Sequence, residues 1–273
     1  MSNDYKFQKM DNVLMKKILY LLLSITLLSN IVFAETFQGG VAEQGQYSSN
    51  RIVDKKTGEG IGGARISLPK QNYSTKSDSD GFFELDTTIN GTSIMSVQKE
   101  NYRPFSMTVN QQTLNAPLVV GIEKSNAHDI AIDSNMYHLG DNSYSDLSAN
   151  AGEFRMNAIG PFYSRQFTMK NINLAKPVYL VIGSIIGIDT AMARSLGQNN
   201  IINSFASPPE VYFNGNKISE IQINGDGQKI KLPPNLIKKG QANEITIKTG
   251  RNLMQNAYID YDDIEFMNLI IEN

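Results

Sequence analysis

Residues 51–109 constrain the fold of this chain more than any other segment, because short runs of alternating polarity follow one another there. In residues 64–68, Ala, Ile and Leu alternate with Arg and Ser, and residues 83–85 continue this period of two, which is the period of a β-strand. Polar turns separate the runs at residues 54–58, 62–63 and 78–81. Gly81 can take the positive φ that such a turn requires. The segment therefore predicts a small β-sandwich.

The spacing of several residues in this segment also matches a recurrent pattern of turns and hairpins. The matching residues are Thr57, Gly58, Ile61, Ala64, Asp80, Gly81, Phe82, Asn101 and Tyr102. In this set the chain resembles the carboxypeptidase regulatory-like domain, a transthyretin-like or immunoglobulin-like sandwich. The resemblance covers about a quarter of the chain and implies no ligand, because a fold does not carry a function by itself.

The first 34 residues have the pattern of a secretory signal peptide. Lys16 and Lys17 form a basic head, residues 18–34 are mostly apolar, and Ala34 is a small residue at the expected cleavage point. Retention as a membrane anchor stays open as an alternative. Residues 35–44 then read as a polar linker, without a membrane span after the signal is removed. Because the chain has no cysteine, we expect a bacterial periplasm, cell surface or exterior rather than a disulfide-rich eukaryotic secretory protein.

Composition argues against several classes of function. The net charge is −2, from 25 basic and 27 acidic residues, so the chain offers no electrostatic footprint for nucleic acid. The two histidines, His128 and His138, do not stand in a zinc-protease spacing. The sequence also lacks a nucleophile elbow and a phosphate-binding loop. We therefore expect a non-enzymatic protein without catalytic residues.

The chain is long enough for two sandwiches after the signal peptide. We place the first at residues 45–123, closing on an apolar strand over 116–122, and the second at 124–273. Asn-Gly pairs at 214–215 and 224–225 predict two-residue hairpins. Helix is expected only as one turn over 233–240 and a helix-compatible run at 191–196. The predicted strands of the second part are 162–169, 178–185, 211–213, 218–223, 228–232, 244–248 and 264–271.

The second part resembles the galactose-binding-like jelly rolls that occur as carbohydrate-binding modules. Residues 138–145, 211–215, 232–245 and 262–269 carry the resemblance as a set. It implies a glycan or cell-surface polysaccharide as the ligand. The chain departs from many sugar-binding members because it has no Trp, although Tyr and Phe can also cover the apolar side of a sugar ring.

Aromatic and polar residues of the second part are the candidates for such a binding site. The platform candidates are Tyr137, Tyr144, Phe162, Tyr163 and Tyr212, and the candidate hydrogen-bonding partners are Asp141, Asn142, Arg165 and Arg194. Most of these aromatic residues are expected in the core. Because Tyr212 and Phe213 adjoin in a strand, one of the two faces inward, and the sequence leaves open which one.

Four carboxylates near the end of the chain, at Asp260, Asp262, Asp263 and Glu265, suggest a cation site. In a strand, Asp263 and Glu265 face the same side, and crowded carboxylates need a neutralising group. One hypothesis is a structural calcium ion bound by Asp263 and Glu265 and completed by Asp141. The alternative is a solvated edge strand that carries charge against edge pairing. Residues 78–81 imitate the start of a calcium loop, but a hairpin turn explains them better.

These patterns predict a secreted binding protein in which the second sandwich binds a glycan and the first is a spacer or docking module. Two alternatives stay open. The chain could be a structural or protein-interaction component of the bacterial envelope, with envelope proteins as its partners. It could also belong to an enzyme system whose catalytic chain is separate.

Overall fold

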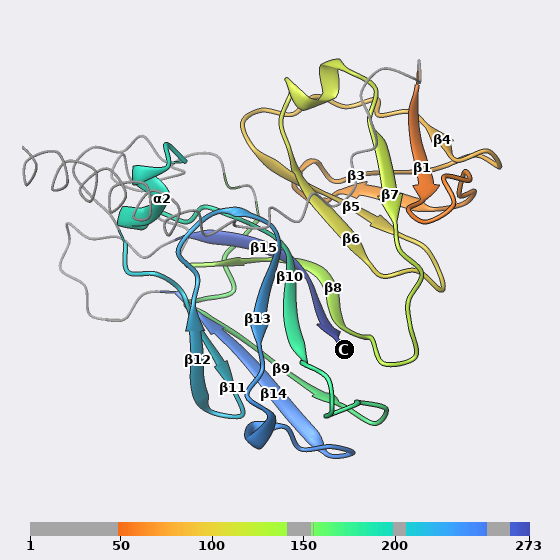
Figure 1. Cartoon of the computed structure of the whole chain (residues 1–273). Helices are drawn as coiled ribbons and strands as arrows, with labels where there is room; N and C mark the ends of the chain where they lie inside the picture. Colours follow the sequence, from red (N-terminus) through yellow and green to blue (C-terminus); the bar gives the residue numbers. More distant parts are fainter. Residues whose placement is uncertain (1–48, 141–153, 155, 199–205, 250–262) are drawn as a thin grey trace, which may run out of the picture. The chain divides into compact units, whose positions relative to one another are not determined.

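The structure is a computed structural model that describes residues 49–140, 154, 156–198, 206–249 and 263–273 (Figure 1). Residues 39–273 form one compact unit. The strands of the described residues lie in four sheets and nearly all pair antiparallel, so the predicted all-β sandwich fold is confirmed. No helix in these ranges has the length and apolar character needed to cross a membrane. The predicted signal peptide and linker lie outside the described residues.

Two sheets form the first sandwich. One has the order β4-β1-β7, with β1 parallel to β7 and antiparallel to β4. The other has the antiparallel order β3-β2-β5-β6. The elements are β1 (Asn50–Asp54), β2 (Arg65–Leu68), η1 (Pro69–Gln71), β3 (Tyr73–Lys76), β4 (Phe82–Phe83), β5 (Ser93–Gln98), β6 (Phe105–Val109), η2 (Thr113–Asn115) and β7 (Val119–Ile122).

Alternation along these strands builds the first core. In β2, Ile66 and Leu68 are fully buried, whereas Arg65, the first residue of the strand, is exposed. The predicted turn at residues 78–81 is confirmed: the Asp78 Oδ1 accepts hydrogen bonds from the Asp80 and Phe82 N–H groups at 2.9 and 2.8 Å. Gly81 has φ +88°, and a Cβ there would lie 2.3 Å from the Ile52 carbonyl oxygen. The acidic motif therefore closes a turn, as its hairpin interpretation requires.

Two further sheets form the second sandwich, in the orders β13-β10-β15-β8 and β12-β11-β14-β9. The inward side chains of both sheets make one apolar core. The elements are β8 (Ile130–Leu139), β9 (Phe162–Thr168), β10 (Tyr179–Ile186), α2 (Ala191–Ser195), β11 (Glu210–Phe213), β12 (Asn216–Glu220), β13 (Gly225–Lys231), η3 (Pro234–Leu236), β14 (Ala242–Lys248) and β15 (Ile264–Glu272).

Strand β15 is the central strand of its sheet and is buried along almost its whole length. It pairs antiparallel with β10 on one side and with β8 on the other. Phe266, Leu269 and Ile271 belong to the core of the sandwich, whereas Met267 joins an apolar cluster on the opposite face with Ile94 of β5. Because both faces of β15 are covered, its sequence is almost continuously apolar instead of alternating.

The outer face of sheet β3-β2-β5-β6 packs against the outer face of sheet β13-β10-β15-β8, with β6 next to β10 and β13. Gly183 permits this approach, because a Cβ there would lie 2.5 Å from the Ser106 Oγ and 2.7 Å from the Asn268 Cβ. The Asp226 carboxylate accepts hydrogen bonds from Thr108, from its N–H at 3.0 Å and from its Oγ1 at 2.8 Å. The first sandwich therefore covers one sheet face of the second sandwich, and the outer face of the other sheet of the second sandwich, β12-β11-β14-β9, lies outside this contact.

Arg103 ties the polar joint after β7 to both sandwiches. Its guanidinium donates to both oxygens of Asp129, at 2.6 and 3.0 Å, and to Glu123 at 3.1 Å. It also lies 3.7 Å from the Glu272 carboxylate at the end of β15. These contacts raise the pKa of Arg103, even though its burial acts in the opposite direction. A planar guanidinium suits this bidentate arrangement, which a lysine could not reproduce.

The predicted strands from 162 onward are present within a few residues of their expected bounds, but one hairpin prediction is wrong. Asn214 and Gly215 have φ +49° and +79° and join β11 to β12. Asn224 and Gly225 do not form such a hairpin, because β12 pairs with β11 and β13 pairs with β10 of the other sheet. The Asn224 side chain instead binds the backbone of Ile188. The domain boundaries at residues 45, 123 and 124 stay a prediction.

Candidate functional site

The outer face of sheet β12-β11-β14-β9 combines aromatic and polar side chains, and we refer to it as the outer face. Strands β11 and β14 alternate: Val211 and Phe213 of β11 are fully buried, as are Ile245 and Ile247 of β14. Tyr212 therefore projects outward, which answers the question that the sequence left open. The other outward residues of the face are Phe162, Ser164 and Gln166 of β9, Glu244, Thr246 and Lys248 of β14, Glu210 of β11, and Lys217 and Glu220 of β12.

Strand register places the two outward aromatic residues of the outer face, the exposed Phe162 and the half-buried Tyr212, on a diagonal. Phe162 lies opposite Lys248, which lies opposite Glu210, and Tyr212 follows Glu210 by two residues. The two aromatic residues are thus two strands apart, about 10 Å, and two residues apart along the strands, about 7 Å, which gives a separation of about 12 Å. The Lys248 Nζ lies 4.4 Å from the centre of the Tyr212 ring.

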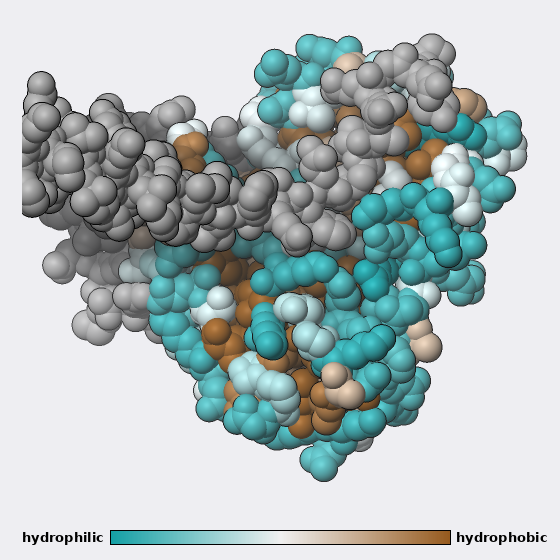
Figure 2. Space-filling model, viewed as in Figure 1, coloured by the Kyte–Doolittle hydropathy of each residue, from teal (hydrophilic) through white to brown (hydrophobic). Residues whose placement is uncertain are grey.

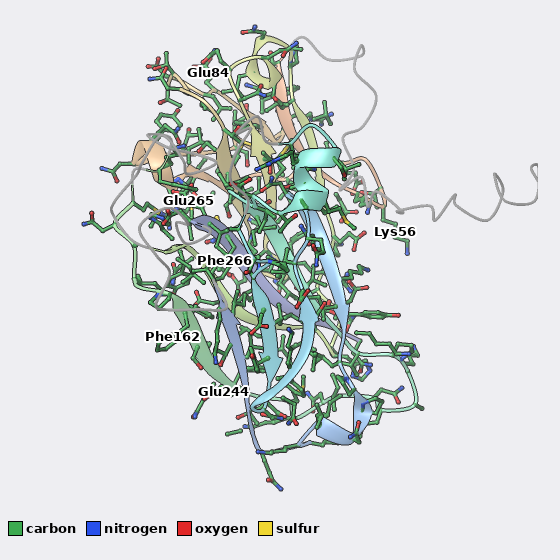
Figure 3. All side chains as sticks on the ribbon, turned by 90° about the vertical axis from the view of Figure 1, so that its left-hand side faces the viewer. Lys56, Glu84, Phe162, Glu244, Glu265 and Phe266 are labelled. Atoms are coloured by element: carbon green, nitrogen blue, oxygen red, sulfur yellow. The ribbon has the colours of Figure 1, made fainter. Side chains whose placement is uncertain are left out.

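Phe162 is one of five large apolar side chains that are exposed among the described residues, and 56% of its surface is accessible. Figure 2 shows that hydrophilic residues cover most of the visible surface of the described part, with smaller hydrophobic areas between them. In Figure 3, Phe162 lies at the outside of the second sandwich, whereas Phe266 lies toward its middle. A single exposed ring is ordinary on a protein surface, but on this face it lies near a second outward aromatic residue, Tyr212.

Hydrogen bonds hold the polar side chains around Tyr212 in place. The Tyr212 hydroxyl donates to the Glu210 Oε2 at 2.7 Å, and this hydrogen bond raises the pKa of Tyr212. Lys217 donates to Glu210 and, at 2.7 Å, to Glu220. These two hydrogen bonds raise the pKa of Lys217. Hydrogen bonds therefore hold the carboxylates of Glu210 and Glu220 in position on this side of the outer face.

A second polar group lies on β9 and β14. Ser164 Oγ and Thr246 Oγ1 are 3.1 Å apart, and the Gln166 amide donates to the Glu244 Oε2 at 3.3 Å. Figure 3 places Glu244 on the same sandwich as Phe162. Hydroxyl, amide and carboxylate groups in this arrangement can exchange hydrogen bonds with a hydroxyl-rich ligand.

Three of the predicted binding residues meet elsewhere, at the edge where β8 and β9 approach each other. The Tyr137 and Tyr163 hydroxyls both donate to the Asp133 Oδ2, at 2.7 and 2.9 Å. The Asn135 N–H donates to the other oxygen of Asp133 at 3.0 Å, and the Arg165 Nε lies 3.8 Å from Oδ2. We call Asp133, Tyr137, Tyr163 and Arg165 the edge brace.

Burial and hydrogen bonds together shift the pKa values of the edge brace. Desolvation by burial acts to raise the pKa of Asp133, but its hydrogen bonds and the Arg165 charge outweigh it and the pKa falls. Burial and the hydrogen bond to Asp133 raise the pKa of Tyr163 strongly. Tyr163 is only 5% exposed, and its ring packs 4.6 Å from the Tyr137 ring and 5.3 Å from the Phe266 ring. The structure thus places Tyr163 in the core, where its ring is not available for stacking on a sugar.

The predicted metal ligands Asp263 and Glu265 lie beside His138. Glu265 is the cross-strand neighbour of His138, and the Asp263 Oδ1 lies 3.3 Å from the His138 Nε2. The His138 Nδ1 lies 2.7 Å from the Met156 carbonyl oxygen. All three side chains are buried, and the ring of Phe154 stacks on His138 at 4.7 Å.

Both ring nitrogens of His138 lie beside acceptor oxygens, an arrangement that favours the protonated ring. Burial alone would lower the pKa of His138, but the hydrogen bonds to Asp263 and Met156 and the charge of Glu265 raise it. Among the described residues, no group of three His, Cys, Asp or Glu side chains has metal-binding geometry. Asp141, Asn142 and Tyr144, which complete the predicted metal and ligand sites, lie outside the described residues together with Asp260 and Asp262.

Phe162 and Tyr212 stand out in the sequence as candidate binding residues, whereas the polar residues around them do not. The missed residues are Ser164, Gln166, Glu210, Lys217, Glu220, Glu244, Thr246 and Lys248. The alternation in residues 162–168 and 242–248 carries the signal that assigns them to one face, once both segments are known to pair. Arg194, a predicted hydrogen-bonding partner, instead lies 3.7 Å from the Asp189 carboxylate beside α2.

Comparison with known proteins leaves the family open. No protein-family model matches the chain, and no curated protein matches it. Among solved structures, the chain is similar to a β-porphyranase of glycoside hydrolase family 86 from the human gut bacterium Bacteroides plebeius. That alignment has a TM-score of 0.28 and 11% sequence identity, and it covers 72% of this chain. The chain spans 38% of that enzyme's length, and a likeness this distant supports no statement about activity.

Proposed function

We propose that this protein is a non-enzymatic glycan-binding protein and that the outer face binds the glycan. The observation that carries the proposal is the pair of outward aromatic residues, the exposed Phe162 and the half-buried Tyr212, whose backbone positions lie about 12 Å apart among hydrogen-bonded polar groups. Each ring can cover the apolar side of one sugar ring, and the polar groups between them can bind sugar hydroxyls.

The arrangement of acidic groups on the outer face argues for binding rather than hydrolysis. A glycosidase needs a protonated carboxyl group beside a second carboxylate. Glu210 and Glu220 lie close together, but both accept hydrogen bonds from the single ammonium group of Lys217. A cation between two carboxylates favours their charged forms, so this pair is unsuited to act as a general acid.

We further propose that residues 1–34 direct export, that the first sandwich is a carboxypeptidase regulatory-like module and that the second is a galactose-binding-like jelly roll. The sequence resemblances described above support these assignments. Calcium bound near Asp263 and Glu265 would be structural in this proposal, tying the residues that follow β8 to the start of β15. Both carboxylates are buried and lie close together, which is compatible with a cation there.

A glycan array probed with the full chain tests the proposal directly. We expect binding to a subset of polysaccharides, and we expect Phe162→Ala and Tyr212→Ala each to weaken it about tenfold or more. Leu174→Ala is the matched control, because Leu174 is 43% exposed but lies outside the outer face. A blank array, or equal loss in the Leu174 variant, would contradict the proposal. Recovery of an envelope protein with a blank array would favour the alternative of a protein-interaction component.

A further inference from the structure

A polar groove lies where the first sandwich meets β8 of the second. It encloses about 300 Å³, which is at the low end for small-molecule sites. Its lining from the first sandwich includes Arg65, Gln98, Lys99 and Tyr102, and Ser134 of β8 closes the other side. The Gln98 amide donates to the Ser134 carbonyl oxygen at 3.3 Å, which fixes both walls. This groove is separate from the outer face, because none of its residues belongs to sheet β12-β11-β14-β9.

Arg65, which lines the groove, lies beside a second cation on the neighbouring strand. Arg65 of β2 is the cross-strand neighbour of Lys76 of β3, and both side chains are exposed. Neither side chain makes a hydrogen bond or ion pair with any described residue. Like charges directly opposite each other destabilise a strand pair. Solvent screens part of this repulsion, and an anion bound at Arg65 would relieve the rest.

The remaining groups of the groove narrow the choice of ligand. The Lys99 ammonium donates to the Gly62 carbonyl oxygen at 2.7 Å and so adds a fixed positive charge. Glu100, which also lines the groove, disfavours a densely charged polyanion. Tyr102 and Pro104 supply apolar surface, and the amide oxygen of Gln98 can accept a hydrogen bond from a hydroxyl group. Together these groups suit a monosaccharide or disaccharide that carries a single carboxylate.

We propose that this groove is a second carbohydrate site and that it binds an acidic sugar of the uronic acid class. The guanidinium of Arg65 binds the sugar carboxylate through two parallel N–H donors, and Lys76 on the neighbouring strand adds positive charge nearby. The sugar ring then lies against Tyr102 and Pro104, and Gln98 contacts a hydroxyl group. The site is independent of the proposed function of the outer face, because no residue is shared between them.

The test is a titration of the full chain with galacturonic acid, followed by NMR chemical shifts. We expect saturable binding that weakens as salt is added, and Arg65→Gln should weaken it about tenfold, which is typical for the loss of a charge-assisted hydrogen bond. Lys231→Gln is the matched control, because Lys231 of β13 is also exposed, has no described partner and changes the charge by the same amount. Thermal unfolding of both variants checks that the fold is intact.

Three further titrations test whether the groove binds an acidic sugar rather than another ligand. The methyl ester of galacturonic acid should bind at least about tenfold more weakly, since it lacks the charge. Equal binding of the ester, or no effect of Arg65→Gln in a folded protein, would overturn the proposal. A triglutamate peptide that binds as tightly as galacturonic acid would also overturn it, in favour of an acidic peptide. Phe162→Ala should leave the titration unchanged, so failure here and failure of the outer face are distinguishable.

Discussion

Replacing Tyr163 by Phe separates a structural role of the edge brace from a binding role. The change removes one hydroxyl group, which donates to the Asp133 Oδ2 at 2.9 Å in a site where Tyr163 is 5% exposed. A hydrogen bond to a charged group contributes about 1.5–3 kcal/mol. Tyr137 still donates to the same oxygen at 2.7 Å, so we expect the lower part of this range, about 1.5 kcal/mol of lost stability.

Removing both hydroxyl groups leaves the buried Asp133 carboxylate with only the Asn135 N–H and the distant Arg165 charge. We therefore expect Tyr137→Phe with Tyr163→Phe to cost about 3–5 kcal/mol, more than the sum of the single changes, because a buried charge is then poorly compensated. Urea unfolding followed by circular dichroism measures these values. Tyr212→Phe is the matched control, since its hydroxyl group is on the outer face, and it should cost less than about 0.5 kcal/mol.

The reasoning would be refuted if Tyr163→Phe left the urea midpoint unchanged while glycan binding was lost. That result would assign the edge brace to the ligand, as the sequence analysis expected for Tyr137, Tyr163 and Arg165. Unchanged binding with the expected loss of stability would confirm that these residues fasten β8 to β9.

Three further predictions concern pH, calcium and the contact between the sandwiches. Burial raises the pKa of Asp189 to about 7, so its contribution to stability is present at low pH and is lost between about pH 4 and 7. Asp189→Asn should therefore make the free energy of unfolding depend less on pH across that range. An unchanged slope of the free energy of unfolding against pH would refute this. A calcium chelator should lower the thermal midpoint if the ion binds, whereas an unchanged transition removes the calcium proposal. Gly183→Ala should lower the urea midpoint, because a Cβ there would lie 2.5 Å from the Ser106 Oγ and 2.7 Å from the Asn268 Cβ. Gly183→Ala combined with Ser106→Gly should recover part of this loss, and an unchanged midpoint in Gly183→Ala would contradict the close contact.

The strands of the second sandwich were largely predictable, because their alternation and the flanking turns are local signals. Local signals did not predict which sheet each strand joins. The pair Asn224 and Gly225 has the residue types of a two-residue hairpin, yet the chain crosses there from one sheet to the other. Strand β8 was missed as a long strand because its inward and outward residues do not alternate cleanly, with Asp133 and His138 both buried.

The candidate site was predictable only in part for a related reason. The sequence indicated which aromatic residues belong to strands, but burial decides which of them are exposed. Tyr163 and Tyr212 are chemically identical in the sequence, and only the pairing of β9 with β14 and of β14 with β11 places one inside and the other outside. The ionic partner of Asp263 was also not predictable, since His138 lies far away in the sequence and reaches it through the pairing of β8 with β15.

The central position of β15 has a consequence for how this protein folds. Strands β8 and β10 do not pair with each other and meet only through residues 264–272, which are the last strand of the unit in order of synthesis. Until that segment emerges, both neighbours keep an open edge and uncovered apolar side chains, which favours aggregation. The second sandwich of a nascent chain therefore stays unassembled, or is held by a chaperone, until residues 264–272 have emerged.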